Sequence, residues 1–148
     1  SNNNPIISFR IITTGSQVLN PASPFDCAAH YPAELNELKS FIKENKIQGV
    51  VFLDGDRHHS EVIEVKQDGM YPLYDITASP LTAGSHKFDG PEKNNPYRIV
   101  GVENIQNFSK ITINGGKNNR VLKVEYIGPK GEMLNEWSVN EKALKFSK

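Results

Sequence analysis

The sequence is poor in cysteine, in unbalanced charge and in long apolar runs. Cys27 is the single cysteine among 148 residues, so no disulfide can form within the chain and cysteine content does not indicate a redox compartment. Seventeen basic and seventeen acidic residues give a formal net charge of zero. This balance argues against a nucleic-acid surface, which normally carries a basic excess. No apolar run approaches the roughly 20 residues that a membrane-spanning helix needs.

The length and the pattern of the chain indicate one domain. The 148 residues are enough to bury a single core, and we treat 1–148 as a single domain. No internal repeat is present, and the only low-complexity tract is the run of asparagines at 2–4. The chain shows no signal peptide.

A polar cluster directly follows a short apolar run in the first half of the chain. Val50–Leu53, bounded by Gly49 and Gly55, predicts a strand buried on both faces. Five potential metal ligands lie within the next eight residues: Asp54, Asp56, His58, His59 and Glu61. Ligands bind just beyond the carboxyl ends of strands in open α/β folds, which is where this cluster falls. The alternative is a solvated turn, but we favour a metal or phosphate site because the cluster ends a hydrophobic strand.

The ligand types in this cluster narrow the choice of metal. Oxygen and imidazole ligands together suit Zn, Mn, Fe or a mixed-metal site, and the carboxylate of Asp56 is able to bridge two ions.

A strand-helix-strand unit precedes the cluster. Ile6–Thr14 carries apolar residues on both faces and predicts an interior strand. Pro32–Lys46 predicts the main helix, because Pro32 suits the first helical position. Four residues of that helix should pack onto a sheet: Leu35, Leu38, Phe41 and Ile42. The unit predicts parallel strands joined by a right-handed crossover.

The rest of the chain is predicted to be rich in β-structure. Val62–Lys66 and Tyr71–Ile76 should form a hairpin, with Asp68-Gly69 in a type I′ turn. Residues 97–140 are expected to form a β-meander, with strands at Arg98–Val102, Lys110–Asn114, Arg120–Ile127 and Met133–Val139. Within it, Leu122, Val124 and Tyr126 should face the core, and Phe108 and Trp137 are expected to be core aromatics.

Three further side chains lie in predicted loops. Cys27 is expected to be a small buried residue and not a nucleophile, because no neighbouring base would activate it. His30 and His86 are expected to be solvated, with contact to an active site or substrate as the alternative.

The stretch Gly-Val-Val-Phe-Leu-Asp-Gly-Asp-Arg-His-His-Ser-Glu at 49–61 resembles the last metal-binding motif of alkaline phosphatase D-like (PhoD-like) enzymes, members of the calcineurin-type metallophosphoesterase superfamily. Thr14–Gln17 and Tyr31–Glu34 fit the same family upstream, and Tyr74–Thr82 fits it downstream. The similarity covers about residues 5–85 and, more loosely, the β-rich remainder. It implies an α+β (mixed α/β) fold, β-rich with one main helix, that forms the C-terminal part of an αββα sandwich.

The resemblance also implies an activity. It is that of a metal-dependent phosphatase or phosphodiesterase, which hydrolyses phosphate esters through metal-activated water. The cofactors it implies are divalent or trivalent ions (Fe, Zn, Mn or Ca), two of them in the full-length enzyme. His58 and Asp56 match the metal ligands, and Arg57 is placed to contact phosphate. His59 is either a further ligand or a residue that orients phosphate, and Asp54 is expected to hold a ligand imidazole.

The family's other metal motifs are missing from this sequence. No Gly-Asn-His and no second Gly-Asp motif occurs among the 148 residues. We therefore expect the isolated chain to be inactive, with a missing N-terminal part of the same protein and a phosphate-ester substrate as its partners. Export to the periplasm or cell envelope is implied by the resemblance alone. One alternative is a non-catalytic, β-rich envelope-binding or interaction domain in which the histidine cluster is incidental. Another keeps the fold but changes the substrate to nucleotides, phospholipid head groups or wall polymers.

Overall fold

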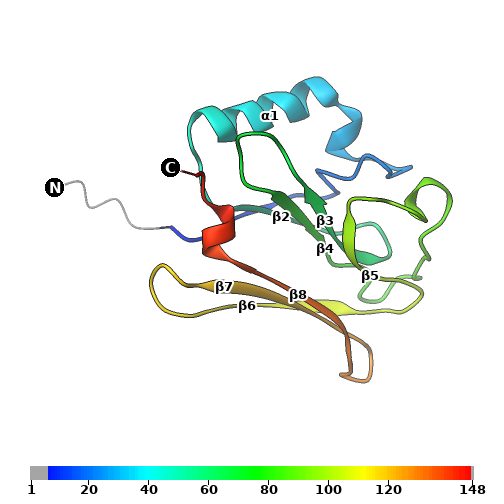
Figure 1. Cartoon of the computed structure of the whole chain (residues 1–148). Coiled ribbons are helices and arrows are strands. Elements are labelled where there is room, and N and C mark those ends of the chain that lie inside the picture. The colour runs from blue at the N-terminus through cyan, green and yellow to red at the C-terminus, as the bar shows by residue number, and fades with distance from the viewer. Residues whose placement is uncertain (1–6, 148) are drawn as a thin grey trace.

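In the computed structural model, residues 7–147 form two β-sheets that face each other, with one long helix on the outer side of the larger sheet (Figure 1). Residues outside this range are not described. The helix is α1 (Pro32–Glu44). The strands are β1 (Arg10–Thr13), β2 (Val50–Asp54), β3 (Ser60–Val65), β4 (Leu73–Thr77), β5 (Arg98–Val102), β6 (Phe108–Asn114), β7 (Val121–Ile127) and β8 (Met133–Asn140). Three short 3-10 turns complete the fold: η1 (Ala28–His30), η2 (Gly90–Glu92) and η3 (Glu141–Leu144). The predicted mixed, β-rich fold with one main helix is confirmed.

The larger sheet has the strand order β1-β2-β4-β3-β5 and mixes parallel with antiparallel pairs. β1 and β2 run parallel, as the crossover through α1 predicted, and β2 also runs parallel to β4. Gly49 precedes β2 with a φ of 77°, and a Cβ there would lie 2.4 Å from the Ser8 carbonyl oxygen. Only glycine allows the two backbones to approach this closely at that point.

Two predictions for this layer were wrong. β1 is an edge strand, not an interior one, so Ile11 and Ile12 are exposed despite their two-sided apolar pattern. Ile6 lies outside the described residues. In α1, Leu35 and Ile42 are buried, but the Phe41 side chain is 56% exposed on the outer face. The period of a helix fixes which residues share a face, whereas the width of the buried stripe depends on what covers it.

The hairpin after the polar cluster is present, but its turn differs from the prediction. β3 and β4 pair antiparallel, with Glu61 opposite Thr77. A connection of seven residues, 66–72, joins them, and within it Gly69 has a positive φ of 69° while Asp68 does not. A type I′ turn needs positive φ at both central residues, so the connection is a longer loop.

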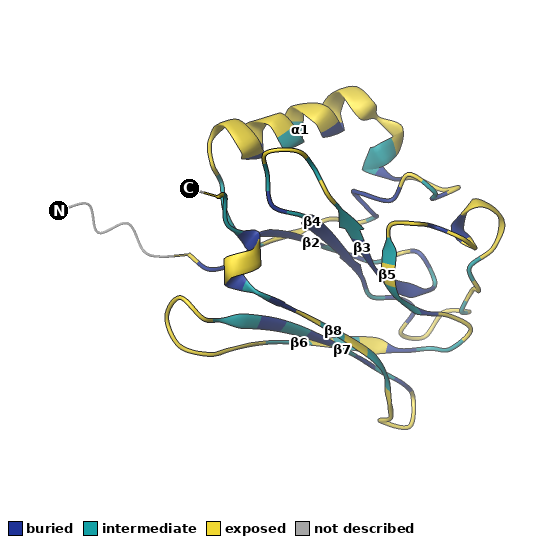
Figure 2. Ribbon diagram, viewed as in Figure 1, coloured by how far each residue is buried: buried dark blue, intermediate teal, exposed yellow. Residues whose placement is uncertain are grey.

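The segment predicted as one meander divides between the two sheets. β5 pairs antiparallel with β3 and completes the larger sheet, whereas β6, β7 and β8 form the smaller sheet. Along β7, every second side chain is buried, as its alternation predicted (Figure 2). Trp137 packs against Tyr74 of the facing sheet with ring centroids 4.6 Å apart, but Phe108 begins an edge strand and is exposed.

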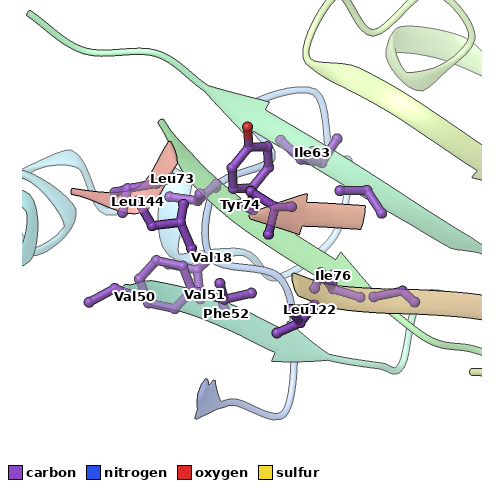
Figure 3. Packing of buried hydrophobic residues seen from close by; sticks show 14 of the residues in the cluster. Val18, Val50, Val51, Phe52, Ile63, Leu73, Tyr74, Ile76, Leu122 and Leu144 are labelled. Atoms are coloured by element: carbon purple, nitrogen blue, oxygen red, sulfur yellow. The ribbon is translucent and has the colours of Figure 1, made fainter. Parts of the chain in front are cut away.

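The hydrophobic core lies between the sheets and beneath α1. Figure 3 shows Leu122 of β7 among side chains of β2 and β4, including Phe52 and Ile76. Leu122 pairs across the strands with Ile113 of β6, so the two side chains lie on the same face of the smaller sheet. Leu122 is at 0% exposure while Ile113, on the edge strand, is 46% exposed.

This pair provides a stability test of the core. Leu122→Ala should lower the free energy of unfolding by about 2–5 kcal/mol, because it removes buried methyl groups and leaves a cavity. Ile113→Ala is the matched control and should have a much smaller effect, since half of that side chain is already in contact with water. Urea denaturation of the three proteins measures both changes. Equal losses in the two variants would contradict this placement of the core.

Candidate functional site

Residues 55–59 form the loop that leaves the carboxyl end of β2. Asp56 and His58 adopt left-handed backbone conformations, with φ of 66° and 58°. Such conformations are costly for non-glycine residues and persist only where the surroundings impose them, often at functional sites. Exposure alternates along the loop: Asp56 is exposed and His58 partly so, whereas Arg57 and His59 are buried.

The orientation of the His58 ring is fixed by a hydrogen bond. Its Nδ1 lies 2.6 Å from the carbonyl oxygen of Gly84, and because a carbonyl only accepts, Nδ1 carries the proton. In the neutral ring, Nε2 then holds the lone pair. This is the arrangement in which a histidine binds a metal ion, with its other nitrogen donating to a backbone carbonyl. His86 stacks on the His58 ring with centroids 4.8 Å apart.

Two adjoining cavities lie at this loop. The smaller, of about 480 Å³, is lined by Pro24, Phe25, Asp26, His30, Asp56, Arg57, His58 and His86. The larger, of about 600 Å³, includes His59, Ser85, Lys87, Asp89, Glu92 and Asn104 in its lining. The two cavities share Pro24, Phe25, Arg57 and His86. Ser85–Lys87 and Asp89–Glu92 thus contribute to the linings. His30 and His86 are exposed, as expected, and both also border the smaller cavity.

Arg57 connects the cavities to a buried polar network. Its Nη2 lies 2.6 Å from Glu92 Oε1, and its Nε donates to Gln17 Oε1 at 3.1 Å. Asn20 donates to Gln17 as well, at 3.0 Å, and Asn95 donates to Asn20. All five side chains are buried. The guanidinium is therefore held firmly, with its charge opposed by Glu92.

Glu61, at the start of β3, is the second carboxylate of this network. Arg98 Nε donates to its Oε2 at 2.7 Å, and Gln17 Nε2 donates to its Oε1 at 2.6 Å. His59 Nε2 lies 3.2 Å from the same Oε1. Burial alone would raise the pKa of Glu61, but the hydrogen bonds and charge of His59, Arg98 and Gln17 hold it below its usual range.

Among residues 7–147, His59, Glu61 and Glu92 are the one set of three acids and histidines close enough to share an ion. Two guanidinium groups already neutralise this set, because Arg57 pairs with Glu92 and Arg98 with Glu61. Two buried negative charges that face one buried and one largely buried guanidinium need no metal ion. We therefore interpret this set as a structural network, in which His59 also packs against Phe88 at 4.7 Å.

Asp54, at the end of β2, faces another carboxyl group. Both Asp54 oxygens and Oδ1 of Asp75 are buried without a donor, while Asp75 Oδ2 accepts from the backbone N–H groups of Val18 and Leu19. Burial and the adjacent Asp75 carboxylate raise the pKa of Asp54 to about 10. A proton on Asp54 supplies the donor that these oxygens lack, because the Asp54 O–H can donate a hydrogen bond to the Asp75 carboxylate. Asp54 therefore contacts Asp75, and not a ligand imidazole as the sequence suggested.

The structure does not bring all four predicted site residues to one cavity. Asp56 and His58 line the smaller cavity, His59 lines the larger one, and Arg57 lines both. Sequence reasoning missed the network roles of Gln17, Glu92 and Arg98. Gln17 lies in the segment Thr14–Gln17 that fits the family, but its role was not visible because each contact joins residues 35 or more apart in the chain. Cys27 is buried as expected, and burial raises the pKa of its thiol.

Comparison with known proteins gives a structural relative. No family model matches this sequence, and no curated protein matches it either. A solved structure described as that of PhoD superposes with a TM-score of 0.67 at 17% sequence identity. The match covers 95% of this chain and 31% of the PhoD chain, so this chain spans less than a third of that protein's length. The two share a fold over this region, as the resemblance at 49–61 led us to expect.

No helix among the described residues has both the length and the apolarity to cross a bilayer.

The Asp54–Asp75 pair predicts how stability depends on pH. In the unfolded chain Asp54 loses its proton near pH 4, whereas in the fold its pKa is about 10. Because the fold binds the Asp54 proton more tightly than the unfolded chain does, this group contributes its full stability below pH 4. That contribution to the free energy of unfolding is lost as pH rises toward 10, by up to ~1.4 kcal/mol per pH unit. Asp54→Asn carries a permanent N–H donor, so its free energy of unfolding should exceed that of the parent increasingly from pH 5 to pH 9.

Urea denaturation at pH 5, 7 and 9 measures the difference between parent and variant. Asp68→Asn changes an exposed acid and should leave the pH profile as it is. Parallel profiles for the parent and Asp54→Asn would show that Asp54 is ionised in the fold.

The buried network predicts a large cost for losing one charge. Glu61→Gln leaves Arg98 without its carboxylate and should destabilise the protein by about 3–5 kcal/mol, since an unpaired buried charge remains. Glu125, on β7, forms ion pairs with two lysines, Lys110 and Lys123. Glu125→Gln is the matched control and should change the free energy of unfolding little. Thermal denaturation with and without EDTA completes the test. A melting temperature that EDTA lowers in an Asp56→Ala/His58→Ala chain, which lacks the other two predicted ligands, would overturn the assignment of His59, Glu61 and Glu92 as a metal-free network.

Proposed function

We propose that this chain contributes part of the active site of a metal-dependent phosphoric ester hydrolase, with Asp56 and His58 as metal ligands. One observation carries the proposal. The His58 ring is fixed through Nδ1 so that Nε2 is the free nitrogen, and it borders the same cavity as the carboxylate of Asp56. The resemblance of residues 49–61 to a PhoD-like metal motif and the fold shared with PhoD support the same function.

The residues present fit a partial site. A carboxylate and an imidazole suit Fe, Zn or Mn, and the left-handed backbone at Asp56 and His58 keeps both close to the cavity. Within residues 7–147, no third acid or histidine comes within reach of one ion together with these two. We propose that the other ligands come from a further part of the same protein. Ions bound at such sites activate water and offset negative charge on the phosphoryl oxygens.

Arg57 is the residue we propose to contact the phosphoryl group. Gln17 and Glu92 hold its Nε and Nη2, so a phosphoryl oxygen in either cavity would be met by Nη1. Because the guanidinium is held before substrate arrives, little conformational entropy is lost on binding. The position of His59 beside Glu61 supports a narrower role than that of a ligand, namely supporting the wall of the larger cavity.

By the same resemblance, we propose that the complete protein acts outside the cytoplasm.

A titration of the chain with Mn²⁺, monitored by isothermal titration calorimetry, tests the ligand assignment. Asp56→Ala and His58→Ala should each weaken binding at least ~10-fold, because each removes one of two ligands. Asp68→Ala removes an exposed carboxylate outside the cavities and should bind as the parent does. Binding should also weaken as pH falls, since only neutral imidazole is a ligand.

A second readout addresses the phosphate. Mn²⁺ bound beside a phosphate ion broadens its ³¹P resonance, so the parent chain should broaden inorganic phosphate more than the His58→Ala chain does. Parent and variants that bind Mn²⁺ alike, or not at all, would contradict the proposal. That result would favour a non-catalytic interaction domain.

A further inference from the structure

The Phe25 side chain is 61% exposed and lies in the lining of both cavities. Exposed large apolar side chains are common on protein surfaces, but among those of the described residues Phe25 is the one that lines both cavities. Phe25 is one of the four residues that the linings of the two cavities share. Any molecule that extends from one cavity into the other would pass it.

The segment that carries Phe25 is held in place from several sides. The Ser23 hydroxyl accepts from the Phe25 N–H at 3.3 Å and donates to the Phe25 carbonyl at 3.1 Å. His30 Nε2 lies 2.8 Å from the Ser23 carbonyl oxygen, and the Cys27 Sγ lies 3.2 Å from the Asn20 carbonyl oxygen. Phe25 is therefore displayed by a fixed loop, and little freedom would be lost when a ligand covers its ring.

The ring is already in contact with a cation. The guanidinium carbon of Arg57 lies 4.9 Å from the ring centroid, in the range of a cation–π contact. Arg57 itself is buried and held by Gln17 and Glu92. With that contact formed and 61% of the side chain still exposed, Phe25 retains open surface on which another planar ring can stack.

The lining of the larger cavity narrows the choice of ligand. Lys87, Asp89 and Glu92 bring charge to it, and Ser85 and Asn104 bring hydrogen-bonding groups. An acyl chain would bury these groups without partners, which is unfavourable. A compact group with polar atoms and one planar face, of a size that fits about 600 Å³, suits the lining better.

We propose that Phe25 is a stacking platform that favours phosphoesters whose alcohol portion bears a planar aromatic ring. This inference rests on the proposed function, which places the phosphoryl group beside Asp56 and His58. The ester substituent then extends past Phe25 into the larger cavity. The shared chemistry is an aromatic ring joined to phosphate, as in a nucleotide or an aryl phosphate.

Calorimetric titrations of the Mn²⁺-loaded chain test this specificity. The probes are adenosine 5′-monophosphate, 4-nitrophenyl phosphate, glycerol 3-phosphate and inorganic phosphate. The two ring-bearing esters should bind about 10-fold more tightly than glycerol 3-phosphate, in line with the usual strength of a base–aromatic stack. A preference for only one of them distinguishes a nucleobase from a phenyl ring.

Phe25→Leu keeps an apolar side chain but removes the π-face, and should reduce the ratio between ring-bearing esters and glycerol 3-phosphate to near one. Binding of inorganic phosphate, measured on both chains, reports separately any change at Arg57, which the Phe25 ring contacts. Phe41→Leu, at an exposed phenylalanine of α1, is the matched control and should keep the full ratio.

The outcomes separate this inference from the proposed function. Phosphate binding with no preference for ring-bearing esters, or with a preference that survives Phe25→Leu, overturns the stacking platform alone. Absence of phosphate binding in the parent chain overturns both. A ratio lost only in Phe25→Leu supports the platform.

Discussion

A buried, charge-compensated network around Glu61 holds the candidate site together. An ionised carboxylate taken out of water costs several kcal/mol unless it is paired and hydrogen-bonded. Glu61 is at 0% exposure, and hydrogen bonds from Gln17, His59 and Arg98 to its carboxylate offset that cost. These three residues come from three separate segments of the chain. The same requirement at Glu92 fixes Arg57. Two carboxylates thus determine where four parts of the chain meet: the loop at Gln17, the loop after β2, the turn η2 and the start of β5.

This network explains the alternation in the loop after β2. Arg57 and His59 turn inward to the carboxylates, so Asp56 and His58, which alternate with them, are left facing the smaller cavity. The inward pair holds the loop in place, and the outward pair consists of the two residues that we propose as metal ligands. The histidine nearest to the buried acids is therefore part of the scaffold, whereas the more exposed histidine has the free nitrogen.

The shared fold and the local motif give different information. A TM-score of 0.67 over 95% of the chain at 17% identity shows that the arrangement of sheets and helix is the same as in a part of PhoD. We base the proposed phosphoester chemistry on the Gly-Asp-x-His segment at the end of β2 and on the two cavities beside it.

The sequence by itself determined the features that depend on neighbouring residues. The apolar run of β2, the start of α1 at Pro32, the antiparallel pairing of β3 with β4 and the alternation in β7 all follow from local periodicity and turn chemistry. The position of Asp56 and His58 just beyond β2 follows from chain order alone.

Only the tertiary structure decided which distant segments meet. It placed β1 at an edge, joined β5 to the larger sheet and brought Gln17, Glu92 and Arg98 to the site. It also left Phe25 exposed above two cavities and set Asp54 against Asp75. Burial and charge pairing are properties of these long-range contacts, and no local pattern encodes them.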